Sequence, residues 1–460
     1  MTPTDARALR RVAVASLVGT TIEWYDYFLF GTASALVFGK IFFPTLSGTA
    51  GTLASFAILS VAFFVRPLGA MVFGHFGDRI GRKTLLVVSL LLTGSSTFLI
   101  GLVPSPETIG AAAPVLLVVL RMMQGLGVSG EWGGAVLLAV EHAPPRKRGF
   151  YGSFPQVGLA LGLLLATGAF ALVGLLPEQD LLSWGWRVPF LASAVLLVVA
   201  LWVRLRVAET PVFAEARERA ERSAEHRIPV VELLRDHWRR VVQGVALRLA
   251  GDVQGYIVTT FTVSYIVNQV GGTSTWATLA VSVAAAASVV LIPTFGIVSD
   301  RVGRKGIYLV GTALGIVLAF PFFALIDTGS LAGTIAAVVL MYAVAGMVPY
   351  AVQGTIYAEM FPTTVRYSGT SLSYNLEGIV GGGIAPFVAA ALLAWSGGAT
   401  WPISLYMMSA GLITVVAAAL TRESFRSDLR RTAAPPPADA VATVPDHEQP
   451  VRTASPRTAR

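Results

Sequence analysis

The chain has 460 residues, of which 54% are hydrophobic and only 13% are charged, against about 25% charged residues in an ordinary soluble domain. Water-soluble packing cannot bury this much apolar surface, so we expect a lipid bilayer to solvate much of it. The absence of cysteine excludes disulfides and cysteine-ligated metals. The net charge of +8 does not indicate nucleic-acid binding, because the basic residues lie in short segments between apolar runs.

Twelve apolar stretches are long enough to cross about 30 Å of hydrocarbon, and each predicts a membrane-spanning helix. Six precede a hydrophilic segment and lie near 12–39, 51–75, 84–104, 113–140, 150–176 and 187–207. Six follow that segment and lie near 239–268, 275–298, 306–327, 332–360, 368–396 and 401–421. The first stretch is too long for the apolar part of a cleavable signal peptide, so we expect it to be retained.

The predicted fold is therefore all-α and integral to the membrane, with a six-helix bundle at 1–207 and a second at 239–421. The linker at 208–238 interleaves Glu and Arg, which predicts an amphipathic helix at the membrane surface, and the tail at 422–460 is predicted to be disordered from its composition. Basic loops such as 146–148 alternate with acidic loops that hold Glu178 and Asp327. The positive-inside rule then predicts that both termini are cytoplasmic.

Two motifs recur in both halves of the chain. Gly74 and the run Asp78-Arg79-Ile80-Gly81-Arg82-Lys83 return as Gly296 and Asp300-Arg301-Val302-Gly303-Arg304-Lys305. The set Glu141, Pro144 and Arg148, at the end of the fourth span, returns as Glu359, Pro362 and Arg366 at the end of the tenth. Two independent repeats at nearly the same offset indicate that the halves are parallel repeats related by an axis along the membrane normal.

These motifs resemble known signatures. The loop that begins at Gly74 resembles the signature between helices 2 and 3 of the major facilitator superfamily, and Leu117-x-x-x-Arg121-x-x-Gln124-Gly125-x-Gly127 is similar to its helix-4 motif. The stretches 19–26, 130–134 and 209–213 are similar to the metabolite:proton symporter family, which includes transporters of shikimate, 2-oxoglutarate, citrate and proline/betaine. The resemblance covers 12–425 and implies proton-coupled transport by a monomer. The helix-5 pattern of drug antiporters does not occur at 152–158, which disfavours drug antiport.

Charges inside the spans are the strongest indicators of function, because each costs about 2.5–3.5 kcal/mol at the centre of a membrane helix. Glu23 and Asp26 lie three residues apart and share one face of the first helix. Two carboxylates that meet in a low dielectric disfavour double ionisation, a property that a proton carrier needs. We expect Glu23, Asp26 and Arg121 to couple transport to protons. The alternative is that they only neutralise charges on neighbouring helices.

A second set of polar residues within the spans is expected to bind substrate. A buried guanidinium such as that of Arg121 can bind a substrate carboxylate through two parallel hydrogen bonds. The alternative is that Arg121 forms a static pair with an acid of the protein. Arg248 and Asp252, at i and i+4, could instead satisfy each other, while Arg66 and Glu131 are interpreted as structural. The predicted substrate-binding residues are Tyr27, Arg121, Gln124, Gln156, Arg248, Asp252, Tyr256, Gln353, Asn375 and Glu377.

The repeated loop motifs are expected to form a conformational gate. Asp78 can cap a neighbouring helix N-terminus or pair with Arg82, and such a contact would exist only while that side is closed. The alternative is that the basic residues serve membrane topology alone. The predicted gate residues are Gly74, Asp78, Arg79, Gly81, Arg82, Glu141, Arg148, Asp300, Arg301, Arg304, Glu359 and Arg366.

The sequence offers no support for an enzyme. Residues 125–130 match the dinucleotide-binding pattern G-x-G-x-x-G, but they lie within a predicted span and lack the βαβ context that the motif requires. We interpret them, together with 158–162 and 378–383, as sites of close helix packing or helix bending. No histidine pair has metal-site spacing and no nucleophile–base set occurs. We therefore expect no catalytic residues, metal or cofactor.

Together these features predict a secondary transporter of the bacterial cytoplasmic membrane. Its expected partners are the lipid bilayer, protons and a small organic solute, and not nucleic acid; the expected solute is a carboxylate metabolite imported by alternating access. A symporter of zwitterionic osmolytes is the first alternative, although 426–460 lacks the heptads of a coiled coil. A sensor on a transporter scaffold is the second, although the chain has no sizeable soluble domain.

Overall fold

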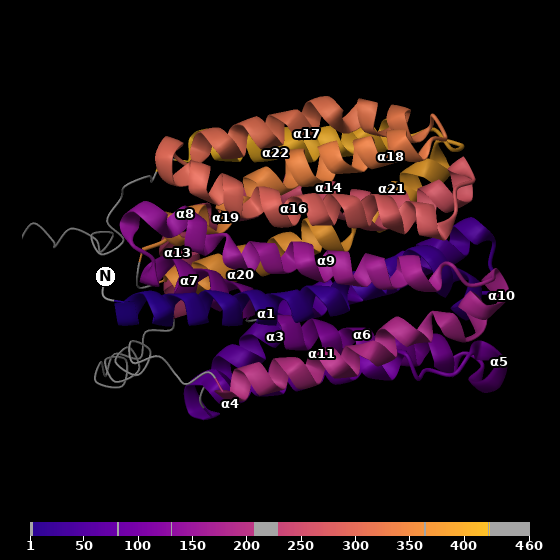
Figure 1. The fold of residues 1–460 in the computed structure, drawn as a ribbon, viewed down its shortest axis with the longest axis horizontal. Coiled ribbons are helices and arrows are strands. Elements are labelled where there is room, and N and C mark those ends of the chain that lie inside the picture. The colour runs from indigo at the N-terminus through magenta and orange to yellow at the C-terminus, as the bar shows by residue number, and fades with distance from the viewer. Residues whose placement is uncertain are drawn as a thin grey trace, which may run out of the picture.

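The computed structural model describes residues 3–80, 82–129, 131–206, 229–362, 365–421 and 423, and within them all regular structure is helical. Figure 1 shows the helices as two groups that lie side by side, with the earlier half of the chain in one group and the later half in the other. This arrangement agrees with the predicted pair of bundles.

The first bundle holds the described helices up to Arg206. These are α1 (Pro3–Ala33), α2 (Gly39–Phe42), α3 (Gly48–Ile80), α4 (Arg82–Ile100), α5 (Pro106–Ile109), α6 (Ala112–Val128), α7 (Glu131–His142), α8 (Arg148–Gly152), α9 (Phe154–Val173), α10 (Glu178–Asp180) and α11 (Arg187–Arg206). π-helical turns at Ser34–Phe38 and Leu181–Gly185 join some of these pieces, so that α1 and α2 form one rod.

The second bundle begins after the linker. Its helices are α13 (Pro229–Asp236), α14 (Trp238–Tyr256), α15 (Thr262–Tyr265), α16 (Ser274–Val302), α17 (Lys305–Ile326), α18 (Leu331–Val338), α19 (Met347–Met360), α20 (Arg366–Gly378), α21 (Ala385–Trp395) and α22 (Trp401–Leu420). π-helical turns interrupt three of its long rods, at Ile257–Phe261 and Ile266–Val270, at Val339–Gly346, and at Ile379–Gly383. Such turns often mark functional sites.

Not every predicted span is equally apolar. In the described part of the chain, eight helices are long and apolar enough to cross a membrane, and a ninth is added if the bent pair Glu178–Gly185 and Arg187–Trp202 counts as one span. The predicted first and seventh spans are not among them; Glu23 and Asp26 lie within the first, and Arg248 and Asp252 within the seventh. The third is short, with an apolar part at Val87–Leu102.

Glycines bring the helices of the first bundle close together. A Cβ atom added at Gly162 of α9 would lie 2.7 Å from Trp24 Cβ and from the Tyr25 backbone nitrogen in α1. A Cβ added at Gly125 of α6 would meet the backbone of Ala62 in α3. Gly125 and Gly127, two of the three glycines that mimic a dinucleotide fingerprint, therefore serve helix packing, and the third, Gly130, lies outside the described residues.

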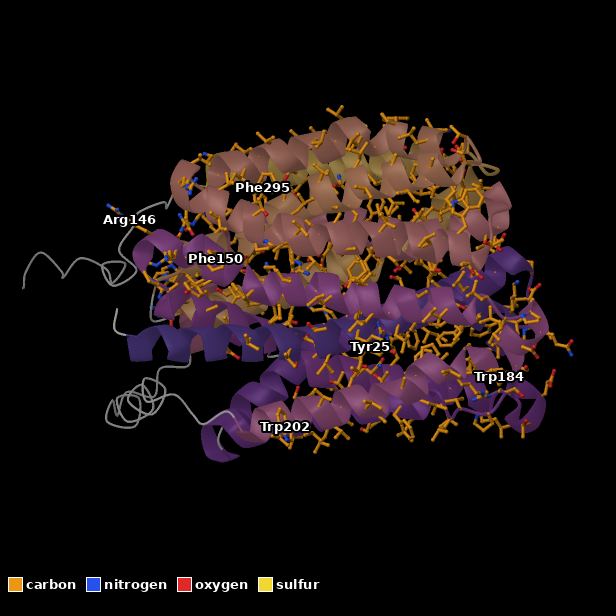
Figure 2. All side chains as sticks on the ribbon, in the orientation of Figure 1. Tyr25, Arg146, Phe150, Trp184, Trp202 and Phe295 are labelled. Carbon is orange, nitrogen blue, oxygen red and sulfur yellow. The ribbon has the colours of Figure 1, made fainter. Side chains whose placement is uncertain are left out.

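Loops that the sequence assigns to opposite sides of the membrane lie at opposite ends of the helical rods (Figure 1). Arg146 and Phe150 lie at the end where α1 begins, and Trp184 lies at the opposite end beside α10 (Figure 2). We call these the Asp300 end and the Glu178 end, after a carboxylate at each. The loops that the sequence assigns to opposite sides of the membrane are thus separated in space.

Candidate functional site

A small cavity in the first bundle brings together the predicted proton-coupling residues. We call it the N-bundle cavity; α1, α3, α4 and α6 supply its walls. Its lining residues are Glu23, Asp26, Tyr27, Ala62, Arg66, Thr93, Arg121, Gln124, Gly125 and Val128. Arg66, which sequence reasoning interpreted as structural, therefore lies beside the two acids.

Arg121 is fully buried and held by neutral groups. Its guanidinium carbon lies 4.5 Å from the ring centre of Tyr27 and 4.3 Å from that of Phe30. Its Nη1 donates to Gln124 Oε1 at 3.0 Å, and its Nη2 has no hydrogen-bond partner among the described residues. Within that part of the chain Arg121 forms no ion pair with a carboxylate, so the static pair that was the alternative interpretation is not found.

A chain of polar side chains links Arg121 to Asp26. Gln124, which binds Arg121, also donates from Nε2 to Thr97 Oγ1 at 2.7 Å. The Thr97 hydroxyl in turn faces the buried Asp26 carboxyl. Asp26 Oδ1 has no hydrogen-bond partner among the residues that the structure describes. A change of charge at Asp26 can therefore reach Arg121 through two side chains.

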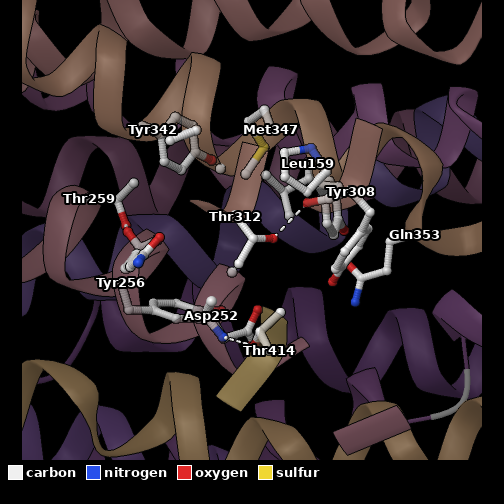
Figure 3. Close-up of a pocket in the computed structure, with 18 of the residues that line it drawn as sticks. Leu159, Asp252, Tyr256, Thr259, Tyr308, Thr312, Tyr342, Met347, Gln353 and Thr414 are labelled. Carbon is white, nitrogen blue, oxygen red and sulfur yellow. Dashed lines mark hydrogen bonds between the residues drawn. The ribbon is translucent and has the colours of Figure 1, made fainter. Parts of the chain in front are cut away.

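A second cavity lies mainly in the second bundle and is called the C-bundle cavity (Figure 3). Trp24, Phe28 and Leu159 close it from the first bundle. The polar residues that line it are Asp252, Gln254, Tyr256, Thr259, Tyr308, Thr312, Tyr342, Tyr350, Gln353 and Thr414. It thus combines hydroxyl and amide groups with aromatic faces and one acid, and no guanidinium lines it.

Three aromatic rings separate the two cavities. The ring centres of Tyr27 and Tyr256 are 5.7 Å apart, and Phe63 packs edge-on against both at 5.2 and 5.6 Å. Tyr27 lines the N-bundle cavity and Tyr256 the C-bundle cavity. The two cavities are therefore neighbours, with these rings packed between them.

Arg248 binds two acids at once beside the C-bundle cavity. Its Nη2 lies 2.9 Å from Asp252 Oδ1 and its Nε lies 2.9 Å from Glu377 Oε2. The guanidinium carbon also lies 3.5 Å from the ring centre of Tyr374, which stacks on Trp132 of the first bundle at 4.0 Å. The alternative interpretation, in which Arg248 pairs with Asp252, is thus the arrangement found, and Glu377 joins the pair from α20.

Two predicted substrate ligands lie in contacts between the bundles. Gln156 accepts from Trp132 Nε1 and donates to the Tyr350 carbonyl oxygen, both at 3.0 Å. Asn375 donates to the carbonyl oxygen of Ser129 at 3.0 Å. Tyr256, Gln353 and Asp252 line the C-bundle cavity, whereas Gln156, Asn375, Arg248 and Glu377 line neither cavity.

The gate motifs of the second half meet the first bundle at the Asp300 end. The Asp300 carboxylate accepts from the backbone nitrogens of Gly149 at 2.8 Å and Phe150 at 3.0 Å, at the start of α8. Arg366 Nη1 lies 3.0 Å from Glu141 Oε1, again across the bundles. Asp300 thus makes the helix-capping contact that the sequence predicts for its repeat counterpart Asp78.

The remaining gate residues stay within one bundle or fall outside the description. Arg304 lies 3.3 Å from Glu359 in the second bundle, Arg301 is exposed, and Arg148 is buried. Gly81 lies outside the described residues, as do the side chains of Asp78, Arg79, Arg82 and Glu131; Gly74 lies within α3. The linker is described only from Pro229, where α13 begins, and the tail beyond 423 is outside the description.

Sequence reasoning missed most of the C-bundle cavity. Tyr308, Tyr342 and Tyr350 were not candidates, because single tyrosines in apolar spans have no sequence signature that distinguishes a cavity wall from core. Trp24 and Phe28 could have been found, since they lie at i and i+4 beside the helix-1 acids.

The family model described as Major Facilitator Superfamily matches residues 17–381. The chain belongs to this superfamily. The shikimate transporter of Escherichia coli (strain K12) is 41% identical over 419 residues, which cover 91% of this chain and 95% of that protein. The inner membrane metabolite transport protein YhjE of the same strain is 41% identical over 434 residues, covering 93% of this chain and 97% of that protein.

Two further comparisons extend the likeness. The proline/betaine transporter of Escherichia coli (strain K12) is 32% identical over 433 residues, covering 93% of this chain and 86% of that protein. A crystal structure of the D-xylose-proton symporter matches the fold with a TM-score of 0.69 at 18% identity, covering 89% of this chain and 96% of the other. The predicted resemblance and fold are thus confirmed, and the chain is a multi-pass membrane transporter of the major facilitator superfamily rather than an enzyme.

Proposed function

We propose that this chain imports a small hydroxylated carboxylate together with protons, across a bacterial cytoplasmic membrane and by alternating access. The observation that carries the proposal is the N-bundle cavity, where Asp26 and Arg121 are buried, have unfilled hydrogen-bonding capacity and lack a partner of opposite charge among the residues that the structure describes. Buried charges in membrane helices mark transport pathways and proton relays.

The two groups are suited to different tasks. Arg121 keeps its charge and can present Nη2 to a carboxylate of the solute. Asp26 can be neutralised by a proton, which removes one negative charge from the cavity before a negatively charged solute enters it. The link through Gln124 and Thr97 supports a coupling in which solute binding at Arg121 alters the hydrogen bonding of Asp26.

The C-bundle cavity would receive the remainder of the solute. Its tyrosine, threonine and glutamine side chains could hydrogen-bond several hydroxyl groups while Trp24 and Phe28 cover an apolar ring face. The 41% identity to a shikimate transporter supports a solute of this kind, a carboxylate on a hydroxylated ring.

The gate contacts support alternating access. The hydrogen bonds of Asp300 and the ion pair of Arg366 with Glu141 join the two bundles at the Asp300 end. They would break when that end opens and so favour the state in which it is closed. Net inward movement of one positive charge would gain about 2.3 kcal/mol per 100 mV of membrane potential.

The osmolyte symporter remains the second candidate. Quaternary ammonium groups bind between aromatic faces, and the C-bundle cavity holds Trp24, Phe28 and Tyr256 near the Asp252 carboxylate. The proline/betaine relative supports this possibility at lower identity.

Uptake into proteoliposomes with an inside-alkaline pH gradient tests the proposal. The panel contains labelled shikimate, 2-oxoglutarate, citrate, a benzoate-type acid and glycine betaine. We expect uptake of a carboxylate that a protonophore abolishes, that Asp26→Asn uncouples from the gradient, and that Arg121→Lys weakens through loss of the guanidinium fork. Saturable uptake of glycine betaine alone would favour the osmolyte symporter, and uptake indifferent to the gradient would refute proton coupling.

A further inference from the structure

We propose that Asp252 and Glu377 share one transported proton, with Arg248 as their common counter-ion, so that the second bundle carries a proton site of its own. The inference rests on the proposed function, since it concerns how many protons accompany the solute. It concerns residues that sequence reasoning assigned to substrate binding.

The geometry at Arg248 joins the two carboxyl groups. Nε and Nη2 form one edge of a guanidinium, and that edge ordinarily binds both oxygens of a single carboxylate. Here Nη2 forms an ion pair with Asp252 and Nε forms one with Glu377, each at a distance of 2.9 Å, so two different carboxyl groups face the same edge. One positive charge therefore faces two acids.

Burial makes the remaining charge costly. The side chains of Arg248 and Glu377 are 2% and 0% exposed. With both acids ionised the cluster would hold one uncompensated negative charge within the membrane region. A single proton shared by the acids removes that charge, and two carboxylates in a low dielectric resist simultaneous ionisation.

A proton can reach the Arg248 cluster from the C-bundle cavity only through Asp252 among the two acids. Asp252 lines the C-bundle cavity and its side chain is 11% exposed, whereas Glu377 lies behind it. The nearby glycines make room for the pair, because a Cβ added at Gly381 would collide with Glu377 Oε1 and one at Gly382 would lie 3.2 Å from Asp252 Oδ2. A proton from the cavity would therefore enter through Asp252.

The other described cation near the pair is Arg66, whose Nη1 lies 3.8 Å from the position of a Cβ added at Gly378, next to Glu377. Arg66 lines the N-bundle cavity with Glu23 and Asp26, so its charge faces those two acids as well. The remaining titratable groups that face the pair are tyrosines, which are neutral at physiological pH. They come from helices or helical turns on several sides and are Tyr27, Tyr256, Tyr308, Tyr342, Tyr350, Tyr357, Tyr374 and Tyr406.

The transport step is a simple proton exchange. With the cavity open to the outside, the pair takes one proton from water and the Arg248 cluster changes from a net charge of −1 to zero. With the cavity open to the inside, the same proton returns to water and the cluster regains its negative charge. No bond other than the O–H bond forms or breaks.

Infrared spectroscopy of the full chain in nanodiscs tests the shared proton without any substrate. We expect the wild type to show a buried carboxylic-acid component, separate from that of Asp26, which is lost in both Asp252→Asn and Glu377→Gln because the acid that remains is matched one to one by Arg248. The exposed Glu178→Gln should leave the band unchanged. Loss of the band in only one of the two variants, or its absence from the wild type, would overturn the proposal.

Two further measurements keep the proposal testable. Wild-type protein labelled with carbon-13 in aspartate or in glutamate needs no substitution, and we expect both labels to shift the band. In proteoliposomes, labelled shikimate with an inside-negative potential and no pH gradient should accumulate in the wild type, since two protons outweigh one carboxylate, but not with Glu377→Gln. An unchanged voltage response in that variant would show that the shared proton is not transported. Failure of the whole solute panel would refute the proposed function and leave the infrared result standing.

Discussion

One substitution at Asp300 should shift the equilibrium between the state in which the Asp300 end is closed and the state in which it is open. The Asp300 carboxylate accepts two backbone hydrogen bonds at the start of α8, at 2.8 and 3.0 Å, and thereby joins the bundles. Each hydrogen bond to a charged group contributes about 1.5–3 kcal/mol, of which water restores part when the end opens. Asp300→Ala should therefore cost the closed state about 2 kcal/mol, a shift of about 30-fold in the equilibrium.

Double electron–electron resonance measures this equilibrium directly. The chain has no cysteine, so spin labels can be attached at Trp202→Cys and Leu420→Cys, which are exposed positions of the two bundles near the Asp300 end. Asp300→Ala should enrich the long-distance population about 30-fold relative to the short one. A second label pair, Trp184→Cys with Trp395→Cys, should report the opposite change at the Glu178 end.

A matched control separates this effect from the general loss of a carboxylate. Asp327 accepts from the Tyr265 hydroxyl at 2.6 Å within the second bundle, so Asp327→Asn should leave the distances at the Asp300 end unchanged. Asp300→Asn, which retains one acceptor oxygen, should produce an intermediate shift. If Asp300→Ala behaves like the control, the cap does not stabilise the closed end and the gating argument is wrong.

Three further predictions concern stability, measured as the thermal unfolding of the purified protein in nanodiscs. Gly162→Ala should destabilise the fold by about 1–3 kcal/mol through overpacking against α1, whereas Gly168→Ala, whose added Cβ meets nothing within 4 Å, should not; equal losses would contradict the packing argument. Lys40→Gln should change the free energy of unfolding by less than about 1 kcal/mol, because the side chains of Lys40 and its partner Glu178 are 50% and 69% exposed. A larger loss would mean that this ion pair is stronger than its exposure implies. Arg187→Met should lower the free energy of unfolding by about 1–3 kcal/mol, because the Arg187 guanidinium donates to the carbonyl oxygens of Gly101 and Val103, at 2.9 and 2.7 Å. No loss would show that water replaces the guanidinium.

The fold was largely predictable because its determinants are local or repeated. Span length and the two duplicated motifs predict twelve helices in two like bundles, and the capping role predicted for Asp78 is found at its counterpart Asp300. The spacing of Glu23 and Asp26 places both in one cavity because helix periodicity needs no tertiary information. The pairing of Arg248 with Asp252 is likewise local.

The rest of the site depends on contacts between distant helices. Glu377 reaches Arg248 from α20, and no sequence spacing indicates that approach. Arg66 was interpreted as structural because Pro67 follows it, yet α3 brings it to the acids of α1. Gln156 has the same chemistry as Gln353, but its two hydrogen bonds fix it between Trp132 and the α19 backbone rather than at a cavity wall.

The central claim is that solute and protons move together, and the proton movement can be observed directly. Proteoliposomes that contain a trapped pH indicator, with no gradient imposed, receive external shikimate or another solute found in the uptake panel. The account predicts that the lumen acidifies with the wild type, that a protonophore abolishes the pH difference, and that Asp26→Asn acidifies the lumen less for each molecule of solute taken up. Solute entry without acidification in the wild type would contradict proton-coupled symport.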